Sequence, residues 1–180
     1  MRVRSILWPG LLLLLTGCAE LLLHDSEDRY WTPGTGTQLQ LMRALVVPGG
    51  ETRVFLQRGE VVARSQLDYY HPSCDLELRA LKQHARSIEQ DVFIVGRLSS
   101  GRESVVQLMQ PQLASTRLVG RFFPHGGASV HRFLRIELLS ERQPDVMRLT
   151  CRGALDDEHA AQLPGRNEIR LALGDILLFL

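Results

Sequence analysis

Alternation of apolar and polar residues across residues 74–80 limits the fold of this chain more than any other feature. The apolar members are Cys74, Leu76, Leu78 and Ala80, and the charged members between them are Asp75, Glu77 and Arg79. A period of two is the repeat of a β-strand, whose successive side chains point to opposite faces. The same period recurs in residues 130–139 and 147–152, so the sequence predicts a mainly β protein.

Weaker patterns before residue 110 predict further elements. Two β-rich runs flank Arg58-Gly59, which predicts a hairpin over residues 53–63. Apolar spacing in residues 81–90 fits a short helix. Residues 92–95 form an apolar run that predicts a strand, and the Ser- and Gly-bearing residues 99–102 predict the turn that ends it.

The C-terminal residues predict a helix followed by a last strand. Asn167 is a good N-cap, Glu168 suits a first helical turn, and Gly174 stands where a helix commonly ends. A helix is therefore predicted over residues 167–173, and the apolar residues 176–180 predict a final strand or core segment. The fold class that we expect is mainly β: a small antiparallel sandwich or partly open barrel with a short C-terminal helix.

The N-terminus has the three-part form of an export signal. Arg2 and Arg4 precede an apolar run over residues 6–15, which is shorter than the roughly 20 residues that a membrane-spanning helix needs. The run ends in Leu15-Thr16-Gly17-Cys18, which resembles the bacterial lipobox. This resemblance implies cleavage before Cys18 and attachment of a diacylglyceryl group and an N-acyl chain, such as palmitate, to that cysteine.

Three segments follow from this signal. We expect a lipoprotein signal peptide at residues 1–17, a lipidated N-terminus and flexible tether at 18–36, and a single β-rich globular domain at 37–180. Pro33-Gly34 breaks regular structure in the tether. Ala19 follows the cysteine where an Asp would favour the inner membrane, so the resemblance to Gram-negative lipoproteins implies an outer-membrane anchor that faces the periplasm.

Two cysteines remain once Cys18 is assigned to the anchor. Cys74 and Cys151 each lie on the apolar face of an alternating segment, so both are expected to point into the core. An even pair in an exported, oxidising compartment favours a disulfide. The alternative is two unrelated buried thiols, because the sequence does not determine whether their Cα atoms come within about 7 Å.

Charge excludes one class of partner and leaves another open. Lys and Arg number 21 against 20 Asp and Glu, so nucleic acid is not an expected partner. Arginine is enriched over residues 117–152, at positions Arg117, Arg121, Arg132, Arg135, Arg142, Arg148 and Arg152. A shared face of these arginines would suit an envelope protein or an anionic lipid. The alternative is ordinary cross-strand pairing with acids elsewhere.

The sequence contains no catalytic, cofactor-binding or metal-binding motif that we can identify. Five histidines follow residue 37, but none has the spacing of a metal-binding pair, and no Gly-x-Ser-x-Gly elbow is present. His71 and His125 lie in Pro- and Gly-bearing loops, where functional residues are frequent but solvated histidines are more frequent. The acidic residues 156–158 lack the spaced oxygens of a calcium loop.

Four short motifs lie along the predicted domain, namely Val54-Phe55-Leu56-Gln57 with Gly59, Tyr70-x-Pro72-x-Cys74, Cys151-Arg152-Gly153 and Glu168-Ile169-Arg170-x-x-Leu173-Gly174. Together they resemble a group of small uncharacterised proteobacterial lipoproteins over most of the domain. The resemblance implies a Gram-negative envelope and supports the Cys74–Cys151 pairing. It implies no activity.

These features predict an envelope lipoprotein with a non-enzymatic interaction or structural role, anchored by lipid at the periplasmic face of the outer membrane. The anchor, the tether and the lack of a catalytic motif favour this interpretation. The alternative is a periplasmic hydrolase or small-ligand-binding protein that uses a loop histidine, His71 or His125. A polar pocket containing either histidine would favour the alternative.

Overall fold

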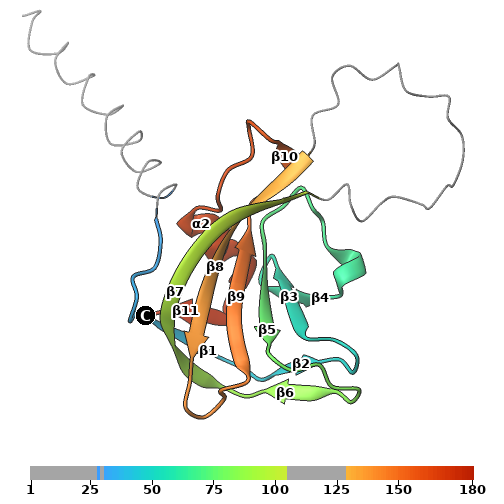
Figure 1. The fold of residues 1–180 in the computed structure, drawn as a ribbon, viewed down its shortest axis with the longest axis vertical. Coiled ribbons are helices and arrows are strands. Elements are labelled where there is room, and N and C mark those ends of the chain that lie inside the picture. The colour runs from blue at the N-terminus through green and yellow to red at the C-terminus, as the bar shows by residue number, and fades with distance from the viewer. Residues whose placement is uncertain (1–27, 29–30, 105–128) are drawn as a thin grey trace, which may run out of the picture.

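A curled antiparallel sheet forms most of the structure, a computed structural model that describes residue 28 and residues 31–104 and 129–180 (Figure 1). The predicted signal peptide, Cys18 and His125 lie outside these residues. The described elements are β1 (Gln38–Leu41), β2 (Leu45–Val47), β3 (Arg53–Gln57), β4 (Glu60–Val62), the 3-10 turn η1 (Arg64–Gln66), β5 (Ser73–Leu78), β6 (Arg86–Ile88), β7 (Asp91–Ser104), β8 (Ser129–Leu139), β9 (Val146–Arg152), β10 (Asp156–Asp157), α2 (Arg166–Leu173) and β11 (Leu177–Phe179).

Nine of these strands form one sheet, in the order β11-β1-β7-β8-β9-β5-β3-β4, with β10 paired to β8. The sheet curls into an open half-barrel, and β2 and β6 form a separate two-stranded sheet (Figure 1). This architecture confirms the predicted class and selects the partly open barrel over the sandwich. Within the described residues, no helix is long and apolar enough to cross a membrane.

The core lies on one face of this sheet and is closed by α2. On β8 the predicted alternation is confirmed, because Leu134, Ile136 and Leu138 are all buried. Helix α2 packs next to β3 and β5 and adds Ile169 and Leu173 to the same cluster. Complete burial of one such side chain contributes roughly 1.5–3 kcal/mol to folding, so the helix is held mainly by its apolar face.

The start of α2 differs from the prediction at its cap. The helix begins at Arg166, with Gly165 rather than Asn167 as its N-cap. Asp28 supplies the missing acceptor, because its Oδ1 lies 2.8 Å from the backbone nitrogen of Asn167. Glu168 accepts a second bond of 2.9 Å from the backbone N–H of Gly165. Orphan donors of the first turn are thus satisfied partly by a residue distant in sequence.

Residues that the sequence assigned to the tether also contact the folded domain. The ring of Trp31 meets that of Phe179 edge to face at 5.4 Å. The backbone N–H of Gly36 donates to the carbonyl of Val95 at 2.8 Å. These contacts and the Asp28 cap extend the folded part to residues before Thr37.

The predicted helix over residues 81–90 is wrong. Residues 86–88 form β6, which pairs with β2 so that Ile88 lies opposite Leu45. Both side chains are almost completely buried in the core. Pairing with a distant segment therefore outweighs the weak helical spacing, because tertiary packing decides the state of short ambiguous runs.

The predicted turn over residues 99–102 is also wrong. Strand β7 continues through these residues to Ser104, and residues 98–104 pair in register with β8. Gly101 lies directly opposite Phe133, whose ring occupies the space that a Cβ at Gly101 would need. Gly101 thus leaves room for a cross-strand aromatic ring instead of ending the strand.

The predicted hairpin is confirmed in β3 and β4. Its two loop residues, Arg58 and Gly59, both have positive φ, as a type I′ turn requires. The N–H of Gly59 donates to the carbonyl of Ala172 in α2 at 3.1 Å. The hairpin turn therefore also holds the C-terminal end of the helix against the sheet.

Candidate binding site on the outer face of the half-barrel

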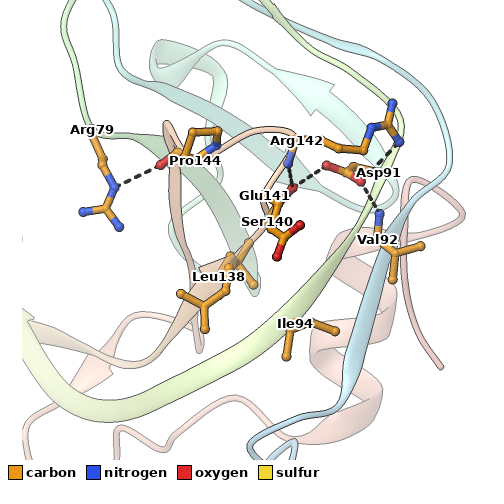
Figure 2. A pocket seen from close by; sticks show the side chains of 10 residues that line it. Arg79, Asp91, Val92, Ile94, Leu138, Ser140, Glu141, Arg142 and Pro144 are labelled. Atoms are coloured by element: carbon orange, nitrogen blue, oxygen red, sulfur yellow. Dashed lines mark hydrogen bonds and ion pairs between the residues drawn. The ribbon is translucent and has the colours of Figure 1, made fainter.

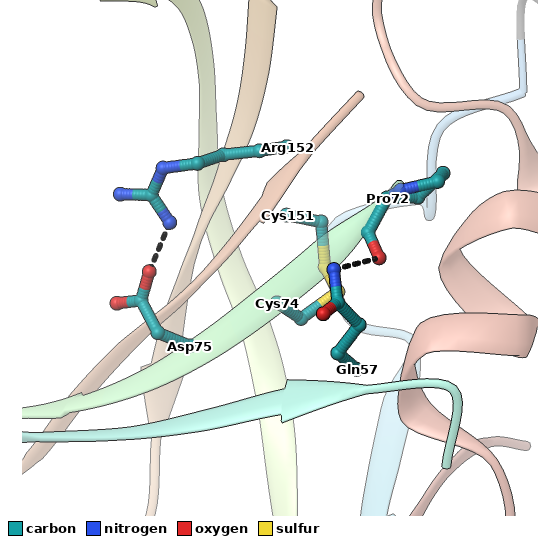
Figure 3. Close-up of a disulfide and its surroundings, with 6 residues drawn as sticks. All are labelled: Gln57, Pro72, Cys74, Asp75, Cys151 and Arg152. Carbon is teal, nitrogen blue, oxygen red and sulfur yellow. Dashed lines mark hydrogen bonds and ion pairs between the residues drawn. A yellow bond between two sulfur atoms is a disulfide. The ribbon is translucent and has the colours of Figure 1, made fainter. Parts of the chain in front are cut away.

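The disulfide joins the two strands that carry the strongest alternation. Cys74 on β5 lies opposite Cys151 on β9, with their Cα atoms 4.0 Å apart. Both cysteines are buried on the core face. The structure thus confirms the predicted pairing (Figure 3).

The opposite face of β5 is buried as well, which alternation alone does not predict. Asp75 is 0% exposed and Glu77 only 8%. Figure 3 shows Asp75 and Arg152 directed toward each other and away from the disulfide. An ionised group without a partner is very costly to bury, so the surroundings of these two carboxylates determine what this face can do.

Asp75 is paired with Arg152 on β9, whose guanidinium also binds Glu103 on β7. Burial raises the pKa of Asp75 even though Arg152 and Arg53 oppose the shift. One oxygen, Oδ2, accepts no hydrogen bond from any described residue and lies 3.7 Å from Nε of Arg53. The pKa of Arg152 is raised: burial would lower it, but the two carboxylates outweigh that effect.

Glu77 is paired with two arginines. Nε of Arg148 lies 2.6 Å from its Oε2, and Nη2 of Arg53 lies 3.2 Å from the same oxygen. Burial would raise the pKa of Glu77, but these hydrogen bonds and charges lower it. For Arg148 and Arg152, the structure thus shows the cross-strand pairing that was the alternative to a shared face of free arginines. Arg117 and Arg121 lie outside the described residues.

A loop of residues 67–72 lies over one end of this face and is held by Gln57. The amide nitrogen of Gln57 donates to the carbonyl of Asp68 at 2.8 Å, and its amide oxygen accepts from the Asp68 N–H at 3.0 Å. Its nitrogen also lies 3.2 Å from the carbonyl of His71. The buried amide of Gln57 thus fixes the loop at several points and places Tyr69 near the sheet.

His131 on β8 is the buried histidine beneath this loop. Its ring is 5.8 Å from the ring of Tyr69, and the side chain is only 3% exposed. Nδ1 lies 2.8 Å from the carbonyl oxygen of Gly153, so Nδ1 carries a proton and donates it. Burial lowers the pKa of His131, against the opposing effects of Gly153 and Glu103. The neutral ring therefore has an unprotonated Nε2, which no described residue contacts by a hydrogen bond.

A cavity of about 150 Å³ opens beside His131. We define the His131 pocket by its lining side chains, which are Arg53, Phe55, Arg64, Leu67, Tyr69, Ser73, Glu103, Ser104, His131 and Arg152. Three guanidinium groups thus lie around a buried neutral imidazole, with one carboxylate among the lining side chains. The arginines can donate N–H groups to a small polar ligand, and Nε2 of His131 can accept a hydrogen bond from it.

A second cavity, of about 640 Å³, lies at the turn between β8 and β9 (Figure 2). Its polar groups are directed at one another: the hydroxyl of Ser140 donates to Asp91 at 2.7 Å, and Arg142 lies 3.4 Å from the same carboxylate. Burial would raise the pKa of Asp91, but the bonds from Ser140 and Gln143 lower it. These groups hold the turn, so we assign them a structural role.

A third cavity, of about 730 Å³, lies between α2 and the β11 edge and includes Trp31. The guanidinium of Arg166 stacks over the ring of Trp31 at 5.4 Å. Trp31 in turn contacts Phe179, so these side chains attach the N-terminal segment to the domain.

The loop histidines favoured by the sequence are not brought into this site. His71 lies at the surface, 3.5 Å from the Asp68 carboxylate, and lines none of the three cavities described above. Of the acidic residues 156–158, Glu158 forms an ion pair with Arg102. Among the described residues, no group of three His, Cys, Asp or Glu side chains is arranged to hold a metal ion.

Sequence reasoning missed His131 because its neighbours in the site come from other strands. Only its phase on β8, shared with Phe133 and Arg135, places it on the outer face.

No protein-family model matches this chain, and no curated protein or solved structure is significantly similar to it.

Proposed function

We propose that this chain is a lipid-anchored bacterial envelope lipoprotein, held by Cys18 at the periplasmic face of the outer membrane, with a non-enzymatic binding or structural domain. The Cys74–Cys151 disulfide is the observation that carries the proposal. Disulfides form and persist in oxidising compartments such as the periplasm, which is where a lipobox signal would deliver the domain.

The arrangement of charged groups supports a binding or structural role. Asp75 and Glu77 are buried and bound to arginines, so they hold strands together. Catalysis by a carboxylate or histidine needs a reacting group within hydrogen-bond reach and a pKa suited to proton transfer. Carboxylates bound to arginines on neighbouring strands are better suited to fixing a surface than to moving protons.

Lipidation is tested by feeding an alkyne fatty acid to a Gram-negative host that produces the full chain. We expect the wild-type protein to carry the label and to fractionate with the outer membrane, and Cys18→Ser to lose both properties. The Cys74→Ala/Cys151→Ala variant is the matched control, because it should keep the label. Equal labelling of wild type and Cys18→Ser would contradict the anchor.

An interaction role is tested by crosslinking in living cells, followed by purification from the membrane. The expected result is reproducible enrichment of one envelope protein or of anionic lipid with the wild-type chain. A protein that stays monomeric and without a partner under these conditions would count against this role.

Small-ligand binding is a second candidate function, and one observation favours it. His131 lines a cavity, and its buried Nε2 has no hydrogen-bond partner among the described residues. The ligand-binding alternative is therefore better supported at His131 than at His71, which lies on the surface.

A further inference from the structure

Among the described residues, none donates a hydrogen bond to Nε2 of His131 in the His131 pocket. Because Nδ1 of His131 donates to Gly153, Nε2 has a lone pair that only a group supplying a proton can satisfy. An acceptor left unpaired in a buried site is destabilised relative to a paired one. A ligand with an O–H or N–H group at this position would remove that penalty.

Positive charge in the lining of the pocket adds a second requirement for the ligand. Arg64 forms no ion pair with any described residue, and Arg53 reaches its carboxylates only through Nε and Nη2. Both guanidiniums line the cavity and retain N–H groups that can donate to a ligand. Guanidinium groups bind the oxygens of carboxylate and phosphate well, often through two bonds at once.

We propose that the His131 pocket binds a phosphate group that still carries one proton. Its P–O–H donates to Nε2 of His131, and its charged oxygens accept hydrogen bonds from Arg53 and Arg64. The cavity of about 150 Å³ suits a group of this size. The proposal rests on the small-ligand candidate and is independent of the lipid anchor.

Sulfate separates this arrangement from general attraction of anions. Sulfate has the shape of phosphate but no proton at neutral pH, so its oxygen would face the lone pair of neutral Nε2. It would bind well only after His131 is protonated. Two charged groups beside His131 shift its pKa, namely Glu103 on β7, which raises it, and Arg152 on β9, which lowers it. Arg53 on β3, Arg64 on η1 and Tyr69 in the loop line the same pocket.

Calorimetry on the full chain in detergent tests the proposal, with inorganic phosphate and sulfate as probes. We expect phosphate to bind at least about tenfold more tightly than sulfate at pH 7.5, as one lost hydrogen bond to a charged ligand implies. The preference for phosphate over sulfate should narrow as the pH falls through the lowered pKa of His131, because the protonated ring can then donate to sulfate. Nitrogen-15 NMR of the His131 ring should show Nε2 unprotonated in the free protein and shifted by phosphate.

Variants separate the contributions of the pocket. His131→Phe should abolish the preference for phosphate, whereas His71→Phe, at the exposed loop histidine, should leave it unchanged. Arg64→Gln should weaken phosphate and sulfate alike. Equal binding of the two anions by the wild-type chain, or a preference that survives in His131→Phe, would overturn the proposal. If His131→Phe does not fold, the proposal is still tested by the preference of the wild-type chain for phosphate over sulfate and by the weaker binding of both anions to Arg64→Gln.

The phosphate compound that competes best for the His131 pocket identifies the source of the phosphate group. Inorganic phosphate, glycerol 3-phosphate and vesicles containing phosphatidic acid all present a protonatable phosphate group. Stronger competition by the vesicles would identify a lipid headgroup, and stronger competition by the soluble forms would identify a free phosphate or phosphate ester. Loss of labelling at Cys18 would leave these results unaffected, so the two proposals can fail separately.

Discussion

Replacement of Arg152 should destabilise the domain far more than replacement of its partner Asp75. Arg152→Leu leaves the carboxylate of Asp75, which is 0% exposed, with Arg53 at 3.7 Å as its one remaining cation among the described residues. Loss of one partner from a buried ion pair typically costs about 3–5 kcal/mol. Asp75→Asn instead removes the buried charge and leaves Arg152 bound to Glu103, so we expect a loss below about 1 kcal/mol.

Urea unfolding of both variants measures this difference, with the m-value checked for constancy. Arg148→Leu is the matched control, since Glu77 keeps Arg53 at 3.2 Å and should limit the loss to about 1–2 kcal/mol. The double variant Asp75→Asn/Arg152→Leu should recover most of the stability lost in Arg152→Leu. That recovery would give a coupling energy between the two positions.

The pH dependence of the same measurement gives an independent check. The pKa of Asp75 is raised in the folded protein, so ionised Asp75 weakens folding as the pH rises through that pKa. Without Arg152 the raised pKa should move further upward. The deficit of Arg152→Leu relative to Asp75→Asn should therefore shrink as the pH falls from 7 towards 4. Equal losses in the two single variants, or a deficit that does not change with pH, would refute the reasoning.

Three further predictions concern stability. Cys74→Ala/Cys151→Ala should lose up to roughly 4–5 kcal/mol in chemical unfolding, because it releases a loop of 77 residues, and a loss below 1 kcal/mol would contradict this. Asp28→Ala should lose about 0.5–2 kcal/mol through the unpaired N–H of Asn167, whereas Asp28→Asn should retain most of that stability in thermal unfolding. Because the pKa of Asp91 is lowered in the folded protein, its ionised carboxylate stabilises the fold above the ordinary aspartate pKa of 3.8. The free energy of unfolding of wild type should therefore exceed that of Asp91→Asn at neutral pH, and this difference should vanish as the pH falls through the folded pKa. An unchanged difference at pH 2 would exclude this cause.

Sequence patterns predicted the elements whose local and tertiary preferences agree. The alternating segments at residues 130–139 and 147–152 are strands β8 and β9, and the expected helix at residues 167–173 is α2. The error over residues 81–90 arose where apolar spacing was short and a distant partner, β2, determined the state. The helix cap was missed because Asp28, which supplies it, lies 139 residues away in the chain.

The candidate site was less predictable than the fold for the same physical reason. The alternation of β5 predicted an ordinary exposed polar face, but its carboxylates are buried and paired with arginines of β3 and β9. His131 acquires its chemistry from Gly153 on one side and Tyr69 on the other, neither adjacent in sequence. A pattern within one strand cannot report such partners, because they depend on which strands pair and in which register.

The pairing of β5 with β9 explains why the disulfide and the candidate site occur together. Each cysteine is followed directly by one member of the ion pair, so Cys74 and Asp75 face opposite sides, as do Cys151 and Arg152. A slip of one residue would turn every side chain of a strand to the other face, burying a carboxylate in the apolar core. The covalent bond on the core face and the ion pair on the outer face thus specify the same register. That register also places Ser73 and Arg152 in the lining of the His131 pocket.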